Sequence, residues 1–268
     1  MNGALLAPFL ALALAAPASA ARDTAAGVQA AFTDLTACSG NPDAHPFCKL
    51  KNESYAPWDE ASRTLVLRAL SPIGEAPGSV VLEGAFAEHG IKGVHFIRMA
   101  SGEDTAASII FEDQVLVYLY PPFFAEKVVY GSWSQQSHVL AHEFFHDYAR
   151  LHATQGVFSS PFYSTLTEAL AWGYPKKRHQ AVPREEYLAK LKLRNALVAE
   201  GKYADSVEVD LGYARSLGFP SLYSMTEVEE YFAELSAFLL HDSALPAQLP
   251  PAVTTWLRAN DLAPLLGG

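Results

Sequence analysis

Short runs of apolar and β-branched residues, bounded by turn-forming residues, predict a small sheet in the first half of the chain. The runs are residues 64–70, 94–98, 108–111 and 115–120. Ser71-Pro72 would end the first run, and Pro121-Pro122 would end the last. Because only residues 112–114 separate the last two runs, we expect these two to form a hairpin.

Elsewhere, apolar residues recur every three or four positions, which predicts helices. The predicted helices are residues 21–37, 79–89, 134–153, 164–174, 184–200, 226–241 and 251–259, with residues 38–62 irregular. The helix at 134–153 has a continuous apolar stripe, and Gly156 marks its end. A half with a small mixed sheet that precedes a helical half predicts an α+β domain with a cleft between the two.

The composition is that of a folded domain whose partners are not polyanions. The chain has 268 residues, half of them hydrophobic, which is enough for the core of one good-sized domain. Its formal net charge of -10 argues against nucleic acid, because phosphates are bound by basic residues. The same charge argues against an anionic membrane surface.

The N-terminal residues predict export from the cytoplasm. Residues 1–20 are rich in Ala and Leu, carry no charged side chain and end in Ala18-Ser19-Ala20, which is typical of a cleaved secretory signal peptide. A buried helix or an uncleaved anchor is the alternative. No later segment has the pattern of a membrane span. We therefore expect a secreted or periplasmic protein.

The two cysteines, Cys38 and Cys48, are close in sequence, with turn-forming residues between them. In an oxidising compartment such a pair is expected to form a disulfide. Two free thiols would follow if the chain stayed in the cytosol. A zinc site at this pair is not expected, because no second Cys or His pair follows at ligand spacing.

Candidate chemistry is concentrated in the helix at 134–153, which contains His142, Glu143 and His146. Residues four apart lie on the same face of a helix, so the two imidazoles can bind one zinc ion. Glu143 flanks that face and can take a proton from a metal-bound water. His138 lies one turn earlier, and we assign it to the surroundings of the site or to the surface, because three ligands from successive turns rarely converge. His152 and His241 are read as ordinary polar residues.

A catalytic zinc needs a third protein ligand, and two glutamates compete for this role. Glu168 lies in a predicted helix that is otherwise almost wholly apolar, although it could also face solvent or pair with a basic residue. Its segment resembles the Leu-x-Glu-Gly-x-Ala of many gluzincins. Glu230 shares a helix face with Ala233 and Ala237, small residues that would allow close approach to the histidines. Its alternative role is that of an acidic first-turn residue in a helix started by a Thr226–Glu229 capping box.

The segment His142-Glu143-Phe144-Phe145-His146 resembles the His-Glu-Phe-x-His motif of the anthrax lethal factor catalytic domain and the Mlc titration factor peptidases. In that group the third ligand is the Glu of a Glu-Phe-Phe-Ala-like motif, and a tyrosine seven residues earlier points into the site. The corresponding residues here are Glu230-Tyr231-Phe232-Ala233 and Tyr223.

The resemblance implies a zincin-like catalytic domain at residues 63–268, preceded by an N-terminal extension at residues 21–62. It implies one Zn²⁺ ion, with Glu230 as third ligand and Tyr223 as the group that stabilises the oxyanion. It covers only residues 138–148 and 223–240. Ala149 stands where the group often has Asp, and Glu168 remains the alternative third ligand.

Together these features predict a secreted zinc metallopeptidase that hydrolyses peptide bonds, with an endopeptidase favoured over an exopeptidase. Residues 115–120 would run along the rim of the cleft and pair with an extended substrate. One alternative is a non-catalytic binding protein with a structural zinc, for which His138 or the unused glutamate would supply a fourth ligand. Another is a zinc hydrolase of a non-peptide bond.

Overall fold

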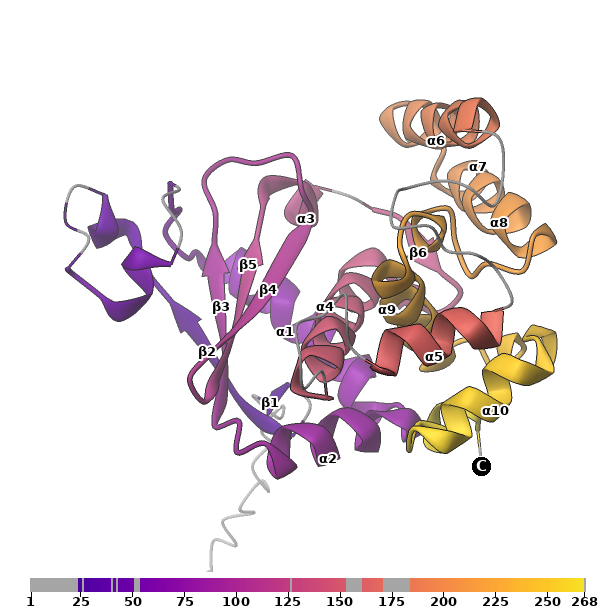
Figure 1. Ribbon diagram of the computed structural model, residues 1–268. Helices are drawn as coiled ribbons and strands as arrows, with labels where there is room; N and C mark the ends of the chain where they lie inside the picture. Colours follow the sequence, from indigo (N-terminus) through magenta and orange to yellow (C-terminus); the bar gives the residue numbers. More distant parts are fainter. Residues whose placement is uncertain are drawn as a thin grey trace, which may run out of the picture.

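The computed structural model describes residues 24–25, 27–39, 41, 43–50, 54–125, 127–152, 161–170 and 184–267. Its centre is a five-stranded mixed sheet of order β1-β2-β3-β5-β4 (Figure 1). The strands are β1 (Thr24–Ala25), β2 (Val28–Thr33), β3 (Gly93–Arg98), β4 (Ala106–Phe111) and β5 (Gln114–Leu119). β2, β3 and β5 are parallel, whereas β1 and β4 are antiparallel to their neighbours.

The sheet is covered on both faces. Val94, Phe96 and Val117 point into the main core, together with α1 (Glu60–Glu75), α2 (Val80–Glu88) and α4 (Gln135–His152). On the opposite face a second core contains Leu35, Phe47, Tyr55, Ile97, Met99, Leu116, Tyr118 and Tyr120. A disulfide between Cys38 and Cys48 closes the segment that covers this second face. β5 is therefore buried on both sides, which explains why nearly every one of its residues is apolar.

The strands predicted at 94–98, 108–111 and 115–120 are confirmed as β3, β4 and β5, but the strand predicted at 64–70 is wrong. These residues belong to α1, because Val66, Ala69 and Ile73 recur at helical spacing and are all buried. The Asp59 side chain caps this helix by accepting a hydrogen bond from Ser62 N at 2.7 Å. Pro72, read as the end of a strand, lies inside the helix near its C-terminal end.

The helix predicted at 21–37 is also wrong within the residues that the structure describes. Residues 28–33 form β2, which pairs in parallel with β3 from Gln29↔Gly93 to Thr33↔Ile97. Gly27, at φ +80°, makes the turn between β1 and β2. Partners distant in sequence therefore decide the conformation of this segment.

The second half of the chain is helical, as predicted. The helices are α5 (Pro161–Leu170), α6 (Arg184–Ala199), α7 (Tyr203–Val207), α8 (Tyr213–Ser216), α9 (Val228–Leu239) and α10 (Pro251–Ala259). α7 and α8, which the sequence did not predict, are joined by a π-helical turn at Glu208–Gly212. The predicted capping box is not formed: Glu227 precedes α9 without a side-chain cap, and Thr226 Oγ1 donates to Tyr223 O instead.

Three short elements lie between the sheet and α4: α3 (Pro121–Ala125) and the two-stranded pair β6 (Val129–Tyr130) and β7 (Trp133–Ser134). In the part of the chain described here, no single helix is long and apolar enough to cross a membrane. One bent pair, Glu60–Glu75 with Pro77–Glu88, passes that test jointly by length and composition, with a bend of 89°. The predicted signal peptide at residues 1–20 lies outside the described residues.

Candidate metal centre

The predicted zinc helix is α4, and it packs lengthwise against α9 (Figure 1). Ala141 on α4 and Ala233 and Ala237 on α9 are completely buried. Small side chains at such a contact allow two helix backbones to approach closely. This approach brings His142 and His146 on one helix to face Glu230 on the other.

The donor atoms of these three residues meet at one point. His142 Nε2 lies 2.9 Å from His146 Nε2, and Glu230 Oε2 lies 3.1 Å from each of them. Three ligands bound tetrahedrally at about 2.0–2.1 Å from a zinc ion lie about 3.3 Å apart, so the arrangement requires only a small expansion to hold one. Glu230 is therefore the glutamate that the fold brings to the two histidines.

The charges at this point favour a cation. Burial alone raises the pKa of Glu230, but hydrogen bonds from His142 and His146 outweigh it and hold that pKa well below the ordinary value. Burial lowers the pKa of His142, yet Glu230 and Glu234 together raise it to about 10. Two carboxylates that favour a proton on a buried imidazole also favour a divalent cation in its place.

Glu234, which the sequence did not identify, supports His142 from the side opposite to Glu230. Its Oε1 lies 3.0 Å from His142 Nδ1 and 3.0 Å from His138 Nε2, and its Oε2 accepts a hydrogen bond from Ser221 Oγ. A carboxylate on the outer nitrogen of a metal-ligating histidine fixes the ring and its tautomer. A signal was present, because Glu230 and Glu234 repeat the four-residue spacing of the facing histidines.

Glu143 and Tyr223 lie beside the three donors. Glu143 is almost fully buried and lines the same cavity as Tyr223. Tyr223 begins a short 3-10 turn, is 52% exposed, and its ring centre lies 5.6 Å from that of His142. A carboxylate and a phenol are thus placed next to a site that can hold a metal.

The other residues considered from the sequence lie elsewhere. Glu168 is exposed on α5 and does not belong to the group of donors. His138 is buried and contacts Glu234, so its assignment to the surroundings of the site fits the geometry. His241 stacks on Trp133 with ring centres 4.7 Å apart and approaches His138.

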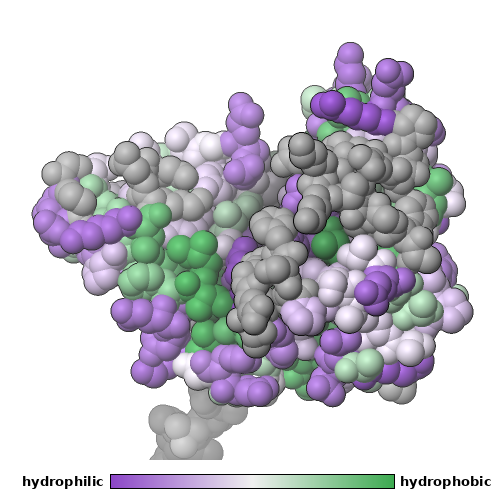
Figure 2. Space-filling model, in the orientation of Figure 1, coloured by the Kyte–Doolittle hydropathy of each residue, from purple (hydrophilic) through white to green (hydrophobic). Residues whose placement is uncertain are grey.

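Two adjoining cavities, of about 310 and 420 Å³, extend from the donors and share Asp104, Ala106, His142, Glu143 and Tyr223. Residues 106–108 of β4 line the second cavity. β4 is one of the two edge strands of the sheet, whereas β5 lies between β3 and β4. The expectation that residues 115–120 pair with a substrate is therefore wrong, because both of their edges are occupied. In Figure 2 hydrophobic residues gather over the sheet, where Ile109 and Phe111 of β4 are half-buried.

No protein-family model matches the sequence, and a comparison with curated proteins finds no similar sequence. Among solved structures, one from Bacteroides caccae, described as a "putative zinc-binding metallo-peptidase", resembles this chain with 14% identity and a TM-score of 0.41. The match covers 90% of this chain and 83% of the other. A likeness at this level assigns no residue roles, which rest on the site geometry alone.

Proposed function

We propose that this protein is a zinc-dependent metallopeptidase of the gluzincin type, with His142, His146 and Glu230 as the metal ligands. The observation that carries the proposal is the convergence of the three donor atoms within 2.9–3.1 Å of one another. Glu143 lies in the same cavity and completes the set of groups that peptide hydrolysis needs. The short motifs that resemble lethal factor and the Mlc titration factors support the same assignment.

Each side chain has a distinct task in this reaction. A zinc ion held here would act as a Lewis acid and lower the pKa of a water toward neutrality. Glu143 accepts the proton of that water and passes it to the leaving amine. Tyr223 donates a hydrogen bond to the oxyanion that forms on the substrate carbonyl. Glu234 keeps His142 in the tautomer whose Nε2 faces the metal.

The cleft supports an endopeptidase with an extended substrate. The two cavities that adjoin His142 and Glu143 leave room for substrate residues on both sides of the scissile bond. Among the described residues, β4 is one of the two edge strands of the sheet, and residues 106–108 lie next to the donors. An extended peptide can add to such an edge through backbone hydrogen bonds.

A structural zinc site is a weaker assignment. A closed site needs four protein ligands, whereas in the described residues this group contains three donors. His138, considered as a fourth ligand, is directed to Glu234. Hydrolysis of a non-peptide bond uses the same groups, and only an assay separates it from peptidase activity.

We also propose that the protein acts outside the cytoplasm, after cleavage of residues 1–20. The disulfide between Cys38 and Cys48 supports an oxidising compartment. The catalytic domain is assigned to residues 63–268. The preceding extension contributes β2 to the central sheet, so the two parts are expected to fold together.

Zinc content and peptidase activity, measured on three glutamate-to-glutamine variants, test the proposal. Glu143→Gln should keep its zinc and lose about 10²–10⁴-fold in activity, the usual contribution of a general base. Glu230→Gln should lose the zinc bound at this site, and its activity with it. Glu168→Gln is the matched control and should change neither. Full activity in Glu143→Gln, or full zinc content in Glu230→Gln, would refute the mechanism.

A further inference from the structure

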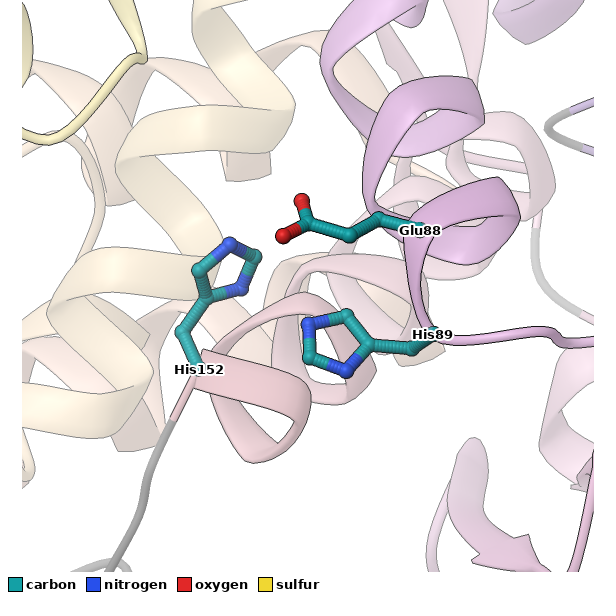
Figure 3. A group of neighbouring side chains, drawn as sticks. All are labelled: Glu88, His89 and His152. Carbon is teal, nitrogen blue, oxygen red and sulfur yellow. The ribbon is translucent and has the colours of Figure 1, made fainter.

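A second group of metal-binding side chains lies where the C-terminal ends of α2 and α4 meet. Glu88 is the last residue of α2, His89 follows it, and His152 is the last residue of α4. One donor atom from each lies within 4.8 Å of the other two (Figure 3). We propose that Glu88, His89 and His152 form a second site for a divalent transition metal, separate from the proposed catalytic centre.

His152 is oriented as metal-ligating histidines commonly are. Its Nδ1 lies 2.8 Å from the backbone oxygen of Tyr148, and its ring stacks on the Tyr148 ring with centres 4.1 Å apart. A carbonyl oxygen can only accept, so Nδ1 carries the hydrogen in the neutral ring. The lone pair is then on Nε2, and the stacked tyrosine restricts rotation of the ring.

The other two ligands are exposed and available. Glu88 and His89 are both exposed, and within the described part of the chain neither side chain has a hydrogen-bond or ion-pair partner. The ring centres of His89 and His152 are 5.5 Å apart, and the two rings meet edge to face. The Glu88 carboxylate extends toward His152 in Figure 3. Small rotations of two exposed side chains suffice to close the site around an ion.

The local field favours a positive charge. The C-terminal ends of two helices meet here, and each carries a partial negative charge. A cation bound at this position would therefore be stabilised by the fold around it as well as by its ligands.

The donor set defines the class of metal. Two imidazoles and one carboxylate suit Zn²⁺ and other late first-row divalent ions, with water completing the coordination. His152 is six residues beyond His146 on α4, about 9 Å along the helix axis, so no ligand is shared. A metal here would link the end of the helix that carries the catalytic residues to α2, and the chain would bind two ions rather than the one expected from sequence.

Zinc stoichiometry, determined by elemental analysis after gel filtration and by calorimetry on chelator-treated protein, tests this site. Wild-type protein should bind two equivalents. The double variant Glu88→Gln/His89→Ala should bind one and keep its peptidase activity. Glu83→Gln, an exposed glutamate on the same helix, is the matched control and should bind two. Because the changed residues are exposed, the fold is expected to survive, which circular dichroism checks.

The same measurements in a His146→Ala background separate this inference from the proposed catalytic site. That variant should still bind one equivalent, and adding Glu88→Gln/His89→Ala should remove it. This result would support the second site even if the peptidase proposal failed. Equal zinc binding by the double variant and wild type, or binding only at millimolar zinc, would overturn the inference.

Discussion

His142 is held from both sides, by Glu230 at Nε2 and by Glu234 at Nδ1. The contact with Glu230 belongs to the proposed metal site. The contact with Glu234 fixes the orientation of the His142 ring. Since Glu234 is buried and also binds His138 and Ser221, it has no freedom to follow a displaced ring. Zinc affinity should therefore depend on a residue that never touches the metal.

The variant Glu234→Gln tests this dependence. It should weaken zinc binding by about 10–100-fold, the usual effect of losing an outer partner of a ligating histidine. Competition with a chromophoric chelator at 25 °C would measure the change. Glu168→Gln makes the same chemical change at an exposed position and should leave the affinity intact. An unaltered affinity in Glu234→Gln would show that the ring needs no such support.

Protonation of His241 should account for part of the loss of folding stability at acidic pH. Burial, followed by the charge of His138, lowers the pKa of His241 to about 3. The unfolded chain titrates near pH 6.5, so it binds the proton first, and stability falls as the pH drops from about 6.5 toward 3. The loss between pH 7 and pH 5 is at most about 2 kcal/mol.

His241→Phe retains a ring to stack on Trp133 and removes this titration. Urea unfolding of metal-free protein at pH 7 and pH 5 should show a smaller loss in the variant than in wild type. The exposed His89→Ala serves as the control and should lose stability as wild type does. An equal loss in His241→Phe and wild type would contradict the assignment.

At this scale the sequence identified what local spacing determines. His142, Glu143 and His146 are fixed relative to one another by one helix, so the candidate metal site can be recognised from their sequence spacing without knowledge of the fold. Glu234 meets its histidine across 92 residues of chain. The four-residue spacing of Glu230 and Glu234 matches that of the histidines, but the contact itself depends on the register of α9 against α4, which a local pattern does not determine.

The sequence predicted the helices and strands that have one exposed face or are bounded by a clear turn. It did not predict the elements whose conformation depends on partners distant in sequence. β3, β4, β5, α2 and α4 fall in the first class. Residues 28–33 contain two alanines and a glutamine and are compatible with a helix, but they pair with β3 as a strand. Residues 64–70 are rich in strand-forming types, but α1 buries them at helical spacing against the sheet.

Gly102 and Gly84 make a matched pair for testing backbone requirements. Gly102 lies in the loop from β3 to β4 at φ +134°, and a Cβ there would clash with the ring of Tyr120. Gly102→Ala should therefore destabilise the fold by about 1–3 kcal/mol. Gly84 is inside α2 with open space around it, and Gly84→Ala should stabilise by about 0.5–1 kcal/mol. Denaturant unfolding measures both, and equal effects would disprove the assigned conformations.

For the whole molecule, the order of a sheet region before a helical region was sufficient to predict the α+β class. The strand order and the second core were not predictable, because they depend on which partners β2 and β5 find. That second core lies on the face of the sheet away from α4. The second core and the candidate metal centre therefore lie on opposite faces of the sheet.

Removal of the disulfide tests this separation. Cys38→Ser/Cys48→Ser should lower the free energy of unfolding by about 2–3 kcal/mol, the chain-entropy value for a loop of this length. Zinc affinity and activity at 25 °C should stay as in wild type. Wild-type protein treated with a thiol reductant should behave as the variant does. A loss of zinc affinity in the double variant would show that the two faces are coupled.

The π-helical turn at Glu208–Gly212 has a consequence for comparing related chains. Such a turn accommodates one residue more than an α-helix would. Asp210 within it accepts hydrogen bonds from Leu222 N at 2.8 Å and Tyr130 OH at 3.1 Å, and so anchors the residue before Tyr223. Deleting one residue here would rotate Asp210 by about 100° and release that anchor. A one-residue gap at this point of an alignment would therefore mark relatives that hold the residue before the tyrosine by other contacts.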